Sequence, residues 1–372
     1  MNQRARFPLA MTDRHTTRKV SVGTLGIGGG SMVSVQTMTT TDTRDAAATL
    51  AQIRVVADAG CDIVRVAVPD REAAASLRAI VRESALPVVA DIHFDHRLAL
   101  DALDAGVAKL RINPGNIGDA ARVREVAKAA ADRNVPIRIG VNAGSLEKRL
   151  MAEVIAGTRT MAEAMAESAV CEARLLEDCG FSAIVLSVKG GRVPDTIAAC
   201  RQVAERTAYP QHVGITEAGT RHAGLVKSAA GIGAILAAGL GDTIRVSLTA
   251  PPEEEVRAGR RILQAFELRP YGPVVVSCPT CGRAGVDVMT IAEELERRID
   301  AEASLRALTI TVAVMGCVVN GPGEARAADI GFAGGHADGM LFRKGEPVGR
   351  IRACDAVARL LEELMNWEPE TE

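Results

Sequence analysis

Three cysteines in the last third of the chain have the spacing of metal ligands. Cys278 and Cys281 form a Cys-x2-Cys turn after the strand-like run 274–276, and Cys317 follows a second such run, 309–314. Thiolates at the ends of rigid elements can converge on a soft metal centre, with backbone N–H groups free to point at sulfur. The motif alone leaves open an iron–sulfur site, a structural zinc site, or cysteines that bind no metal.

The residue that would complete this site is informative. A structural zinc site usually recruits a fourth Cys or His near its third ligand, and none lies close to Cys317. The nearest residue with a metal-binding side chain is Glu324. A hard carboxylate beside three thiolates is unusual, and it would indicate an iron that takes part in chemistry.

Composition and charge exclude several classes of protein. The chain has 372 residues, of which 48% are hydrophobic and 24% charged, as in a globular protein of two domains or of a barrel with an appendage. A net charge of −2 gives no support for nucleic-acid binding. The longest uncharged run, 228–241, is too short and glycine-rich to span a membrane. Because the cysteines lack the pattern of a secreted disulfide scaffold, we expect a reducing compartment, the cytoplasm.

Short β-branched runs alternate with alanine-rich amphipathic stretches along most of the chain. Such alternation predicts helices between the strands of a parallel sheet, and eight units is the closing number of an α/β fold, the (β/α)8 TIM barrel. A hairpin over 20–27 is expected before the first of them. The eight runs are 33–35, 63–66, 88–90, 109–112, 137–141, 183–186, 212–215 and 243–246.

Polar residues of catalytic type lie at the ends of nearly all these runs. In a barrel these ends meet at one mouth, where active sites of this fold lie. A single such residue can be a surface strand end, or can pair with a neighbouring strand. Four arginines and a lysine around one mouth instead predict a strongly anionic ligand, most simply one with two phosphates. The residues are Gln36, Thr37, Arg65, Asp91, His93, Arg111, Asn113, Arg138, Asn142, Lys189, Glu217, Arg245 and Ser247.

Two glycine-rich turns and one acid fit such a ligand. The turns 113–118 and 142–145, the second ending at Ser145, can each offer backbone N–H groups to an oxyanion. Glu217 is an acid among the cations. It is either a counter-ion that limits their repulsion or a general acid or base, and the sequence does not separate these roles.

The segment 269–273, rich in proline and glycine, marks a domain boundary. We therefore expect a leader over 1–17, a barrel over 18–269, and a small α/β domain over 270–372. This last domain is too small to enclose a catalytic cleft, so its metal is expected to act on a ligand held at the barrel mouth. The five other cysteines are interpreted as ordinary buried thiols: Cys61, Cys171, Cys179, Cys200 and Cys354.

Several segments together resemble the family of 4-hydroxy-3-methylbut-2-enyl diphosphate synthases. The resemblance runs over about residues 18–365, and it is to the bacterial two-domain form, without a large inserted domain. The segments that carry it are 90–95, 110–118, 138–145, 214–219, the Cys-Pro-Thr-Cys turn and 316–324.

The resemblance implies a cofactor, a reaction and partners. A [4Fe-4S] cluster would be held by Cys278, Cys281, Cys317 and Glu324. The enzyme would open 2-C-methyl-D-erythritol 2,4-cyclodiphosphate reductively to 4-hydroxy-3-methylbut-2-enyl diphosphate, with loss of water, in the non-mevalonate isoprenoid pathway. Electrons would come singly from flavodoxin or ferredoxin. The implied assembly is a homodimer in which the cluster domain of one chain caps the barrel of the other.

Under this interpretation Glu217 moves the proton that lets a hydroxyl leave as water, and Asn320 orients the substrate at the cluster. The expected substrate-binding residues are Arg65, Asp91, His93, Arg111, Asn113, Arg138, Asn142, Ser145, Lys189, Arg245 and Ser247.

Two alternatives remain at this stage. A barrel transferase of the pterin-binding type, such as dihydropteroate synthase, with a structural zinc domain would leave the thiolates without a catalytic role. A non-enzymatic protein whose zinc site mediates partner binding would leave the charged strand ends unexplained.

Overall fold

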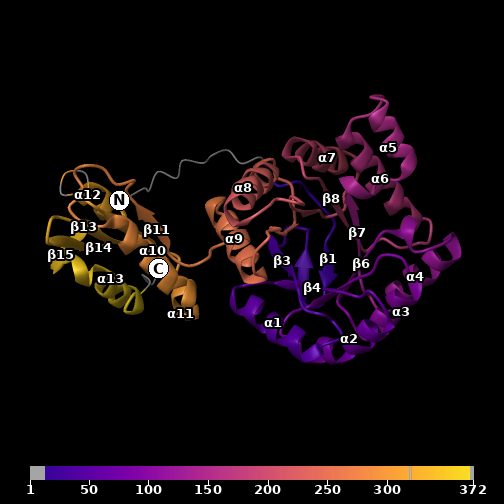
Figure 1. Cartoon of the computed structure of the whole chain (residues 1–372), viewed down its shortest axis with the longest axis horizontal. Coiled ribbons are helices and arrows are strands. Elements are labelled where there is room, and N and C mark those ends of the chain that lie inside the picture. Colours follow the sequence, from indigo (N-terminus) through magenta and orange to yellow (C-terminus); the bar gives the residue numbers. More distant parts are fainter. Residues whose placement is uncertain (1–12, 318, 320, 369–372) are drawn as a thin grey trace. The chain divides into compact units, whose positions relative to one another are not determined.

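The computed structural model describes residues 13–317, 319 and 321–368, and the chain divides into two compact units between Arg269 and Pro270 (Figure 1). Asn320 therefore lies outside the described residues. Within the described ranges, no helix is both long enough and apolar enough to cross a membrane.

The first unit is the predicted (β/α)8 barrel. Its eight strands are parallel and lie in the order β8-β7-β6-β5-β4-β3-β10-β9. A parallel bridge from Leu186 to Gln211, just before β9, brings the two ends of the sheet together. The strands are β3 (Ser34–Met38), β4 (Ile63–Ala67), β5 (Val88–Asp91), β6 (Lys109–Ile112), β7 (Ile137–Asn142), β8 (Ile184–Lys189), β9 (His212–Val213) and β10 (Thr243–Ile244).

The helices between these strands begin at clear local signals. Asp70 caps α2 by accepting the N–H of Ala73, and Thr160 and Glu163 form a capping box at the start of α6. The helices are α1 (Ala46–Asp58), α2 (Arg71–Glu83), α3 (His96–Asp104), α4 (Ala120–Asp132), α5 (Lys148–Ile155), α6 (Met161–Glu177), α7 (Val193–Arg206), α8 (Arg221–Ala237) and α9 (Pro252–Ala265), with single 3-10 turns η1 (Pro114–Asn116) and η2 (Ala143–Ser145).

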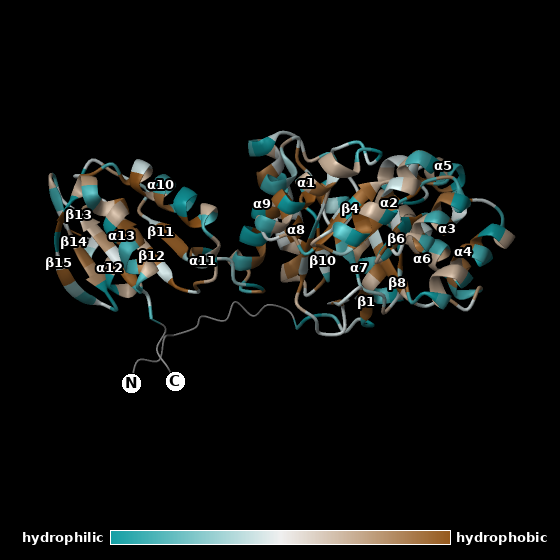
Figure 2. Ribbon diagram, turned by 90° about the horizontal axis from the view of Figure 1, so that it is seen from below, coloured by the Kyte–Doolittle hydropathy of each residue, from teal (hydrophilic) through white to brown (hydrophobic). Residues whose placement is uncertain are grey.

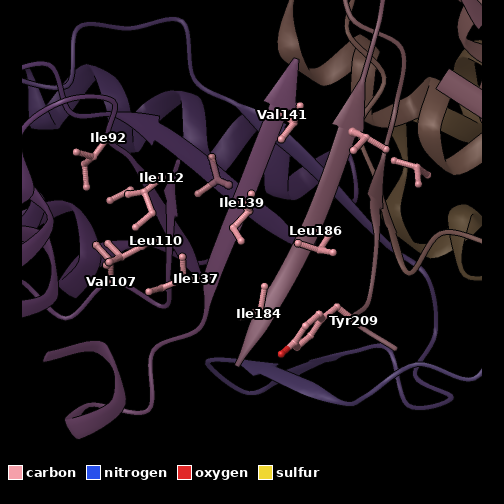
Figure 3. Packing of buried hydrophobic residues seen from close by; sticks show 14 of the residues in the cluster. Ile92, Val107, Leu110, Ile112, Ile137, Ile139, Val141, Ile184, Leu186 and Tyr209 are labelled. Carbon is pink, nitrogen blue, oxygen red and sulfur yellow. The ribbon is translucent and has the colours of Figure 1, made fainter. Parts of the chain in front are cut away.

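Alternation along each strand separates the core from the interior of the barrel. On β7, Ile137, Ile139 and Val141 belong to the hydrophobic core under the helices, where they lie near apolar residues of β8 (Figure 3). Successive side chains of a strand point to opposite faces. The intervening residues Arg138 and Asn142 consequently point into the barrel.

A hairpin covers the N-terminal end of the barrel. It consists of β1 (Val20–Val22) and β2 (Leu25–Ile27), as predicted. Its Val22 and Ile27 pack with Ile63, the first residue of β4, and Val89, the second residue of β5. The chain before it is tied down as well, since His15 N–H donates to the Gly239 carbonyl at 2.9 Å. The N-terminal end of the barrel is therefore covered, so a ligand is expected at the opposite mouth, where the strands end.

A buried ion-pair network joins the start of β4 to α9 and the end of the unit. The Asp62 carboxylate lies 2.8 Å from both Arg260 and Arg269, and it also accepts the N–H of Val35 at 2.7 Å. The Asp62 and Arg260 side chains are only 10% and 8% exposed. We expect Asp62→Ala to lower the free energy of unfolding of the barrel by about 3 kcal/mol, because it leaves buried guanidinium groups without their counter-ion. Urea denaturation followed by circular dichroism measures this change.

Asp104→Ala is the matched control for this prediction. Asp104 also pairs with an arginine, Arg133, but both side chains are about half exposed, at 56% and 42%. Its loss should lower the free energy of unfolding by less than about 1 kcal/mol. Equal effects of the two substitutions would contradict the assignment of the Asp62 network as a stabilising element.

The second unit is built on a five-stranded mixed sheet. The order is β11-β12-β13-β14-β15; β11, β12 and β13 are parallel, and the remaining pairs are antiparallel. Figure 2 shows the hydrophobic character of β11. The elements are β11 (Val274–Ser277), α10 (Val288–Ala301), α11 (Ala303–Arg306), β12 (Thr311–Met315), α12 (Gly321–Ala327), β13 (Ile330–Gly334), β14 (Asp338–Arg343), β15 (Glu346–Arg352), η3 (Ala353–Asp355) and α13 (Ala356–Met365).

The two faces of this sheet carry different cores. Leu295 of α10 and Leu360 of α13 pack with Phe332, whereas Ala325 of α12 belongs to a smaller cluster with Met315. Helix α12 was not predicted, because its sequence begins Gly-Pro-Gly and resembles a turn. It fits because β13 has Gly331, where a side chain would run into the backbone of Ala325.

Candidate active site at the barrel mouth and candidate cluster site

A cavity of about 200 Å³ lies at the C-terminal ends of the barrel strands. Gly140, Ser187 and Thr216 also contribute to it, and none of these three was among the predicted site residues. Strand register explains why distant residues meet here, since Asp91 is paired with Arg111, Arg111 with Arg138, and Asn142 with Lys189. The predicted residues that line it are Arg65, Asp91, His93, Arg111, Arg138, Asn142, Lys189, Arg245 and Ser247.

Asp91 is the acid among the cations of this cavity. Its carboxylate lies 3.3 Å from Arg111, 3.8 Å from Arg65 and 3.6 Å from His93. Burial alone would raise the pKa of Asp91, but these three neighbours outweigh burial and hold the pKa well below its usual range. Asp91 is therefore ionised at neutral pH and holds Arg65 and Arg111 in place.

Glu255 is a second buried carboxylate, and the sequence analysis did not identify it as a site residue. It accepts hydrogen bonds from Thr37 Oγ1 at 2.7 Å, Arg245 Nε at 3.3 Å and the Leu248 N–H at 2.9 Å. It lies in the acidic first turn of α9, beside Glu253 and Glu254. In the folded chain Glu255 shares the buried face of that helix with Pro252 and Gly259.

The cations outnumber the carboxylates around the cavity. Its described lining contains Arg65, Arg111, Arg138, Lys189 and Arg245, against the single carboxylate of Asp91. Burial, reinforced by the other cations, holds the pKa values of Arg138 and Lys189 well below their usual range. Such unbalanced positive charge is unfavourable in the empty site and favours an anion that neutralises it.

A further basic side chain, that of Lys109, lies on the inward face of β6 below Arg111. It is fully buried, and its Nζ donates to Gln36 Oε1 at 3.3 Å. Burial, followed by the charges of Arg138 and Arg65, lowers its pKa well below the usual range. From the sequence, Lys109 was predicted only as the start of a strand. The alternation of side chains along β6 indicates that Lys109 points into the barrel, because Lys109 and Arg111 are on the same face of the strand.

Arg138→Met tests the balance between stability and binding. Arg138 is 2% exposed, and no hydrogen-bond partner for its Nε is found in the described structure. Removing its charge should raise the free energy of unfolding of the ligand-free barrel by about 1–3 kcal/mol. The same change should weaken the binding of inorganic diphosphate by roughly 1.5–3 kcal/mol, because a charged donor is lost. Urea denaturation and titration calorimetry measure the two quantities, and weaker binding without any gain in stability would contradict the electrostatic account.

Five of the residues predicted for the barrel mouth do not line the cavity: Gln36 and Thr37 of β3, and Asn113, Ser145 and Glu217. Asn113 Oδ1 accepts the Gly140 N–H at 3.0 Å and so joins β7 to the turn after β6. Ser145 is exposed, and its hydroxyl donates to the Asn142 carbonyl at 3.3 Å. Glu217 is exposed next to Thr216, and its φ of 52° lies in the left-handed region that non-glycine residues seldom adopt. The roles predicted for these residues therefore remain predictions.

The second unit has a cavity of about 240 Å³ lined by all four predicted cluster ligands, Cys278, Cys281, Cys317 and Glu324. Cys278 follows β11 and Cys317 follows the adjacent parallel strand β12, so the two thiols leave the sheet on the same side. Glu324 comes from the first turn of α12. These two strands and α12 are the elements that bring the four residues together.

The donor set and the cavity fit an iron–sulfur cluster. The Gly316 N–H donates to Cys278 Sγ at 3.3 Å, a type of contact that tunes cluster sulfurs. No group of three Cys, His, Asp or Glu side chains in the described ranges is arranged to hold a single metal ion. A four-iron cluster has no such requirement, because each of its ligands binds a different iron. Thr280, inside the Cys-Pro-Thr-Cys turn, has a φ of 49°.

The remaining cysteines agree only in part with their interpretation as buried thiols. Cys61 and Cys200 are buried, and burial raises the pKa of each to about 12. Cys171 and Cys179 are partly exposed. The interpretation is wrong for Cys354, which is exposed at the turn between β15 and α13.

Comparison with known proteins identifies relatives of both units. The model of the GcpE TIM-barrel domain matches residues 17–260, and that of the GcpE protein C-terminal domain matches residues 274–366. A Geobacter sulfurreducens protein is 54% identical over 94% of this chain and 97% of its own length. A protein from Clostridium acetobutylicum is 52% identical over 95% of this chain and 99% of its own length. Both are named 4-hydroxy-3-methylbut-2-en-1-yl diphosphate synthase (flavodoxin).

Among solved structures, a dihydropteroate synthase from Xanthomonas albilineans covers 67% of this chain and 97% of its own, with 17% identity and a TM-score of 0.47. A likeness at this level gives no support to a pterin-binding transferase. The two family models cover most of the chain, and the curated relatives match along nearly their whole length. The chain therefore belongs to the GcpE family.

Proposed function

We propose that the protein is a 4-hydroxy-3-methylbut-2-enyl diphosphate synthase. It converts 2-C-methyl-D-erythritol 2,4-cyclodiphosphate to 4-hydroxy-3-methylbut-2-enyl diphosphate and water, with uptake of two electrons and two protons, in the non-mevalonate isoprenoid pathway. The names of the curated relatives support this assignment. The observation that carries it is the cavity at the barrel mouth, whose five cationic side chains suit a cyclic diphosphate.

The barrel residues bind the substrate and stabilise its leaving group. Arg65, Arg111, Arg138, Lys189 and Arg245 hold the two phosphates, and the breaking carbon–oxygen bond leaves negative charge on the phosphate that they surround. Because the cations are already in place, little reorganisation is needed as this charge develops. His93, Asn142 and Ser247 supply further polar contacts to the substrate.

We assign the proton transfer to Glu217, which is exposed and follows Thr216, a residue of the cavity lining. Its carboxyl delivers the proton with which the substrate hydroxyl departs as water. Asn113 and Ser145, in the turns that follow β6 and β7, are proposed as further substrate-binding residues, and Asn320 orients the substrate.

Cys278, Cys281, Cys317 and Glu324 hold a [4Fe-4S] cluster in the second unit. When bound, the cluster supplies the two electrons of the reaction one at a time. The curated relatives carry flavodoxin in their names, which supports flavodoxin as the electron donor, with ferredoxin as the alternative. The assembly we propose is a homodimer in which the cluster domain of one chain caps the barrel of its partner.

Anaerobic purification tests this function. We expect a brown protein with iron and sulfide in about equal amounts and a broad absorption band near roughly 400 nm. With reduced flavodoxin it should convert the cyclodiphosphate to the linear product, and chromatography measures this conversion. A colourless protein with about one zinc per chain and no conversion would favour the zinc-domain alternatives.

A further inference from the structure

Glu172 of α6 is a buried carboxylic acid that the proposed chemistry leaves unused. Its side chain lies against the turn that follows β6, and the residue is 6% exposed. Its Oε2 accepts the Gly115 N–H at 2.8 Å, and Gly115 lies within η1. This amide is one that the sequence analysis offered to a substrate oxyanion, and a protein carboxyl already occupies it.

The turn connects Glu172 to the wall of the substrate cavity. A Cβ at position 115 would lie 2.8 Å from Glu172 Oε1, so glycine lets the carboxyl approach the backbone. The Asn116 N–H donates to the Asn113 carbonyl at 2.9 Å, and Asn113 Oδ1 accepts the Gly140 N–H at 3.0 Å. Gly140 lines the cavity. A continuous set of short contacts therefore runs from Glu172 to the site.

Two charged groups face this carboxyl from neighbouring elements. Glu147, which precedes α5 and accepts from Ser168 Oγ at 3.0 Å, adds a negative charge, and Arg111 of β6 adds a positive one. Burial is the largest influence and, with Glu147, raises the pKa of Glu172 to about 7, although the Gly115 N–H and Arg111 act in the opposite direction. Glu172 therefore changes its charge within the physiological range of pH.

We propose that Glu172 is a positioning residue of the substrate site, which fixes the turn after β6 and, when ionised, weakens the binding of an anionic substrate. This inference rests on the proposed function only in taking a diphosphate as the ligand. The neutral carboxyl keeps its hydrogen bond to Gly115 without placing a negative charge behind Arg111. Loss of the proton adds that charge, and it opposes the phosphates that Arg111 attracts.

Glu172→Gln separates the two effects, because an amide oxygen still accepts the Gly115 N–H but cannot ionise. Glu177→Gln is the matched control, since Glu177 ends the same helix and accepts from the Tyr209 hydroxyl at 2.7 Å. Calorimetry with inorganic diphosphate on the full-length holoenzyme at pH 6 and pH 8 gives the affinities. The ratio of wild-type to Glu172→Gln affinity should fall roughly fivefold between these pH values. The ratio of wild-type to Glu177→Gln affinity should stay constant.

Glu172→Ala tests the positioning role. It leaves the Gly115 N–H without its acceptor, and KM for the cyclodiphosphate should rise roughly tenfold with a smaller change in kcat, while Glu172→Gln restores KM at pH 6. Equal pH dependence of the wild type and Glu172→Gln would overturn the inference, even if Glu172→Ala does not fold. A wild type that binds diphosphate but does not convert the cyclodiphosphate would count against the proposed function instead.

Discussion

Replacing Cys281 by Ser is expected to abolish the iron–sulfur cluster and to lower reductase activity by more than about a hundredfold. Cys281 is exposed and lines the cavity with the three other proposed ligands. A serine hydroxyl is a harder donor than a thiol and does not ionise at neutral pH, so it is a poor ligand for iron. Iron and sulfide analysis after anaerobic purification, together with visible absorption, measures the loss of the cluster.

Cys354→Ser is the matched control. Cys354 is also an exposed cysteine of the second unit, but it does not line the cluster cavity. This variant should keep the iron, the sulfide and the activity of the wild type. If Cys281→Ser retained a full complement of iron and sulfide, the proposed ligand set would be wrong.

Glu217→Gln should lower kcat by a factor of about 10²–10⁴, which is the usual contribution of a general acid. The amide is nearly isosteric but has no proton to transfer. Inorganic diphosphate affinity and the cluster spectrum should stay close to those of the wild type, because Glu217 lines neither the substrate cavity nor the cluster cavity. Steady-state kinetics with reduced flavodoxin measures kcat, and calorimetry measures the affinity for diphosphate.

Glu205→Gln is the control for this substitution, because Glu205 is another exposed acid of the barrel, on α7. Its kcat should equal that of the wild type. If Glu217→Gln weakened diphosphate binding while turnover of bound substrate stayed normal, Glu217 would have a binding role. Loss of the cluster in Glu217→Gln would place the residue in cluster assembly.

The architecture of the barrel could be predicted from the sequence, because the patterns that indicate strands and helices are local. Each strand appears as a short apolar run, and the alternation within it already assigns Ile137 and Ile139 to the core and Arg138 to the interior. Once eight such units close a barrel, their C-terminal ends must meet, whatever loops connect them. Most of the charged cavity could therefore be predicted without coordinates.

The cluster site was predictable for a related reason. Cys278 and Cys281 are adjacent by spacing, and Cys317 follows a strand that a small parallel sheet places beside β11. The helix that presents Glu324 was missed, because glycine and proline at its start outweigh the helical signal of the short segment that follows. Its existence depends on packing against β13, where Gly331 leaves room for it.

Only the tertiary structure decided which buried acids contact the residues and turns around the barrel mouth. Glu255 stands among three consecutive glutamates, and only packing shows that it bonds Thr37, 218 positions away. Glu172 looks like any acid in an amphipathic helix until Gly115, 57 positions earlier, is found against it. Strand ends are brought together by backbone hydrogen bonds that local sequence encodes, so their residues can be placed in advance. The charge state of a buried side chain depends on which distant groups surround it, and only the folded chain brings those groups together.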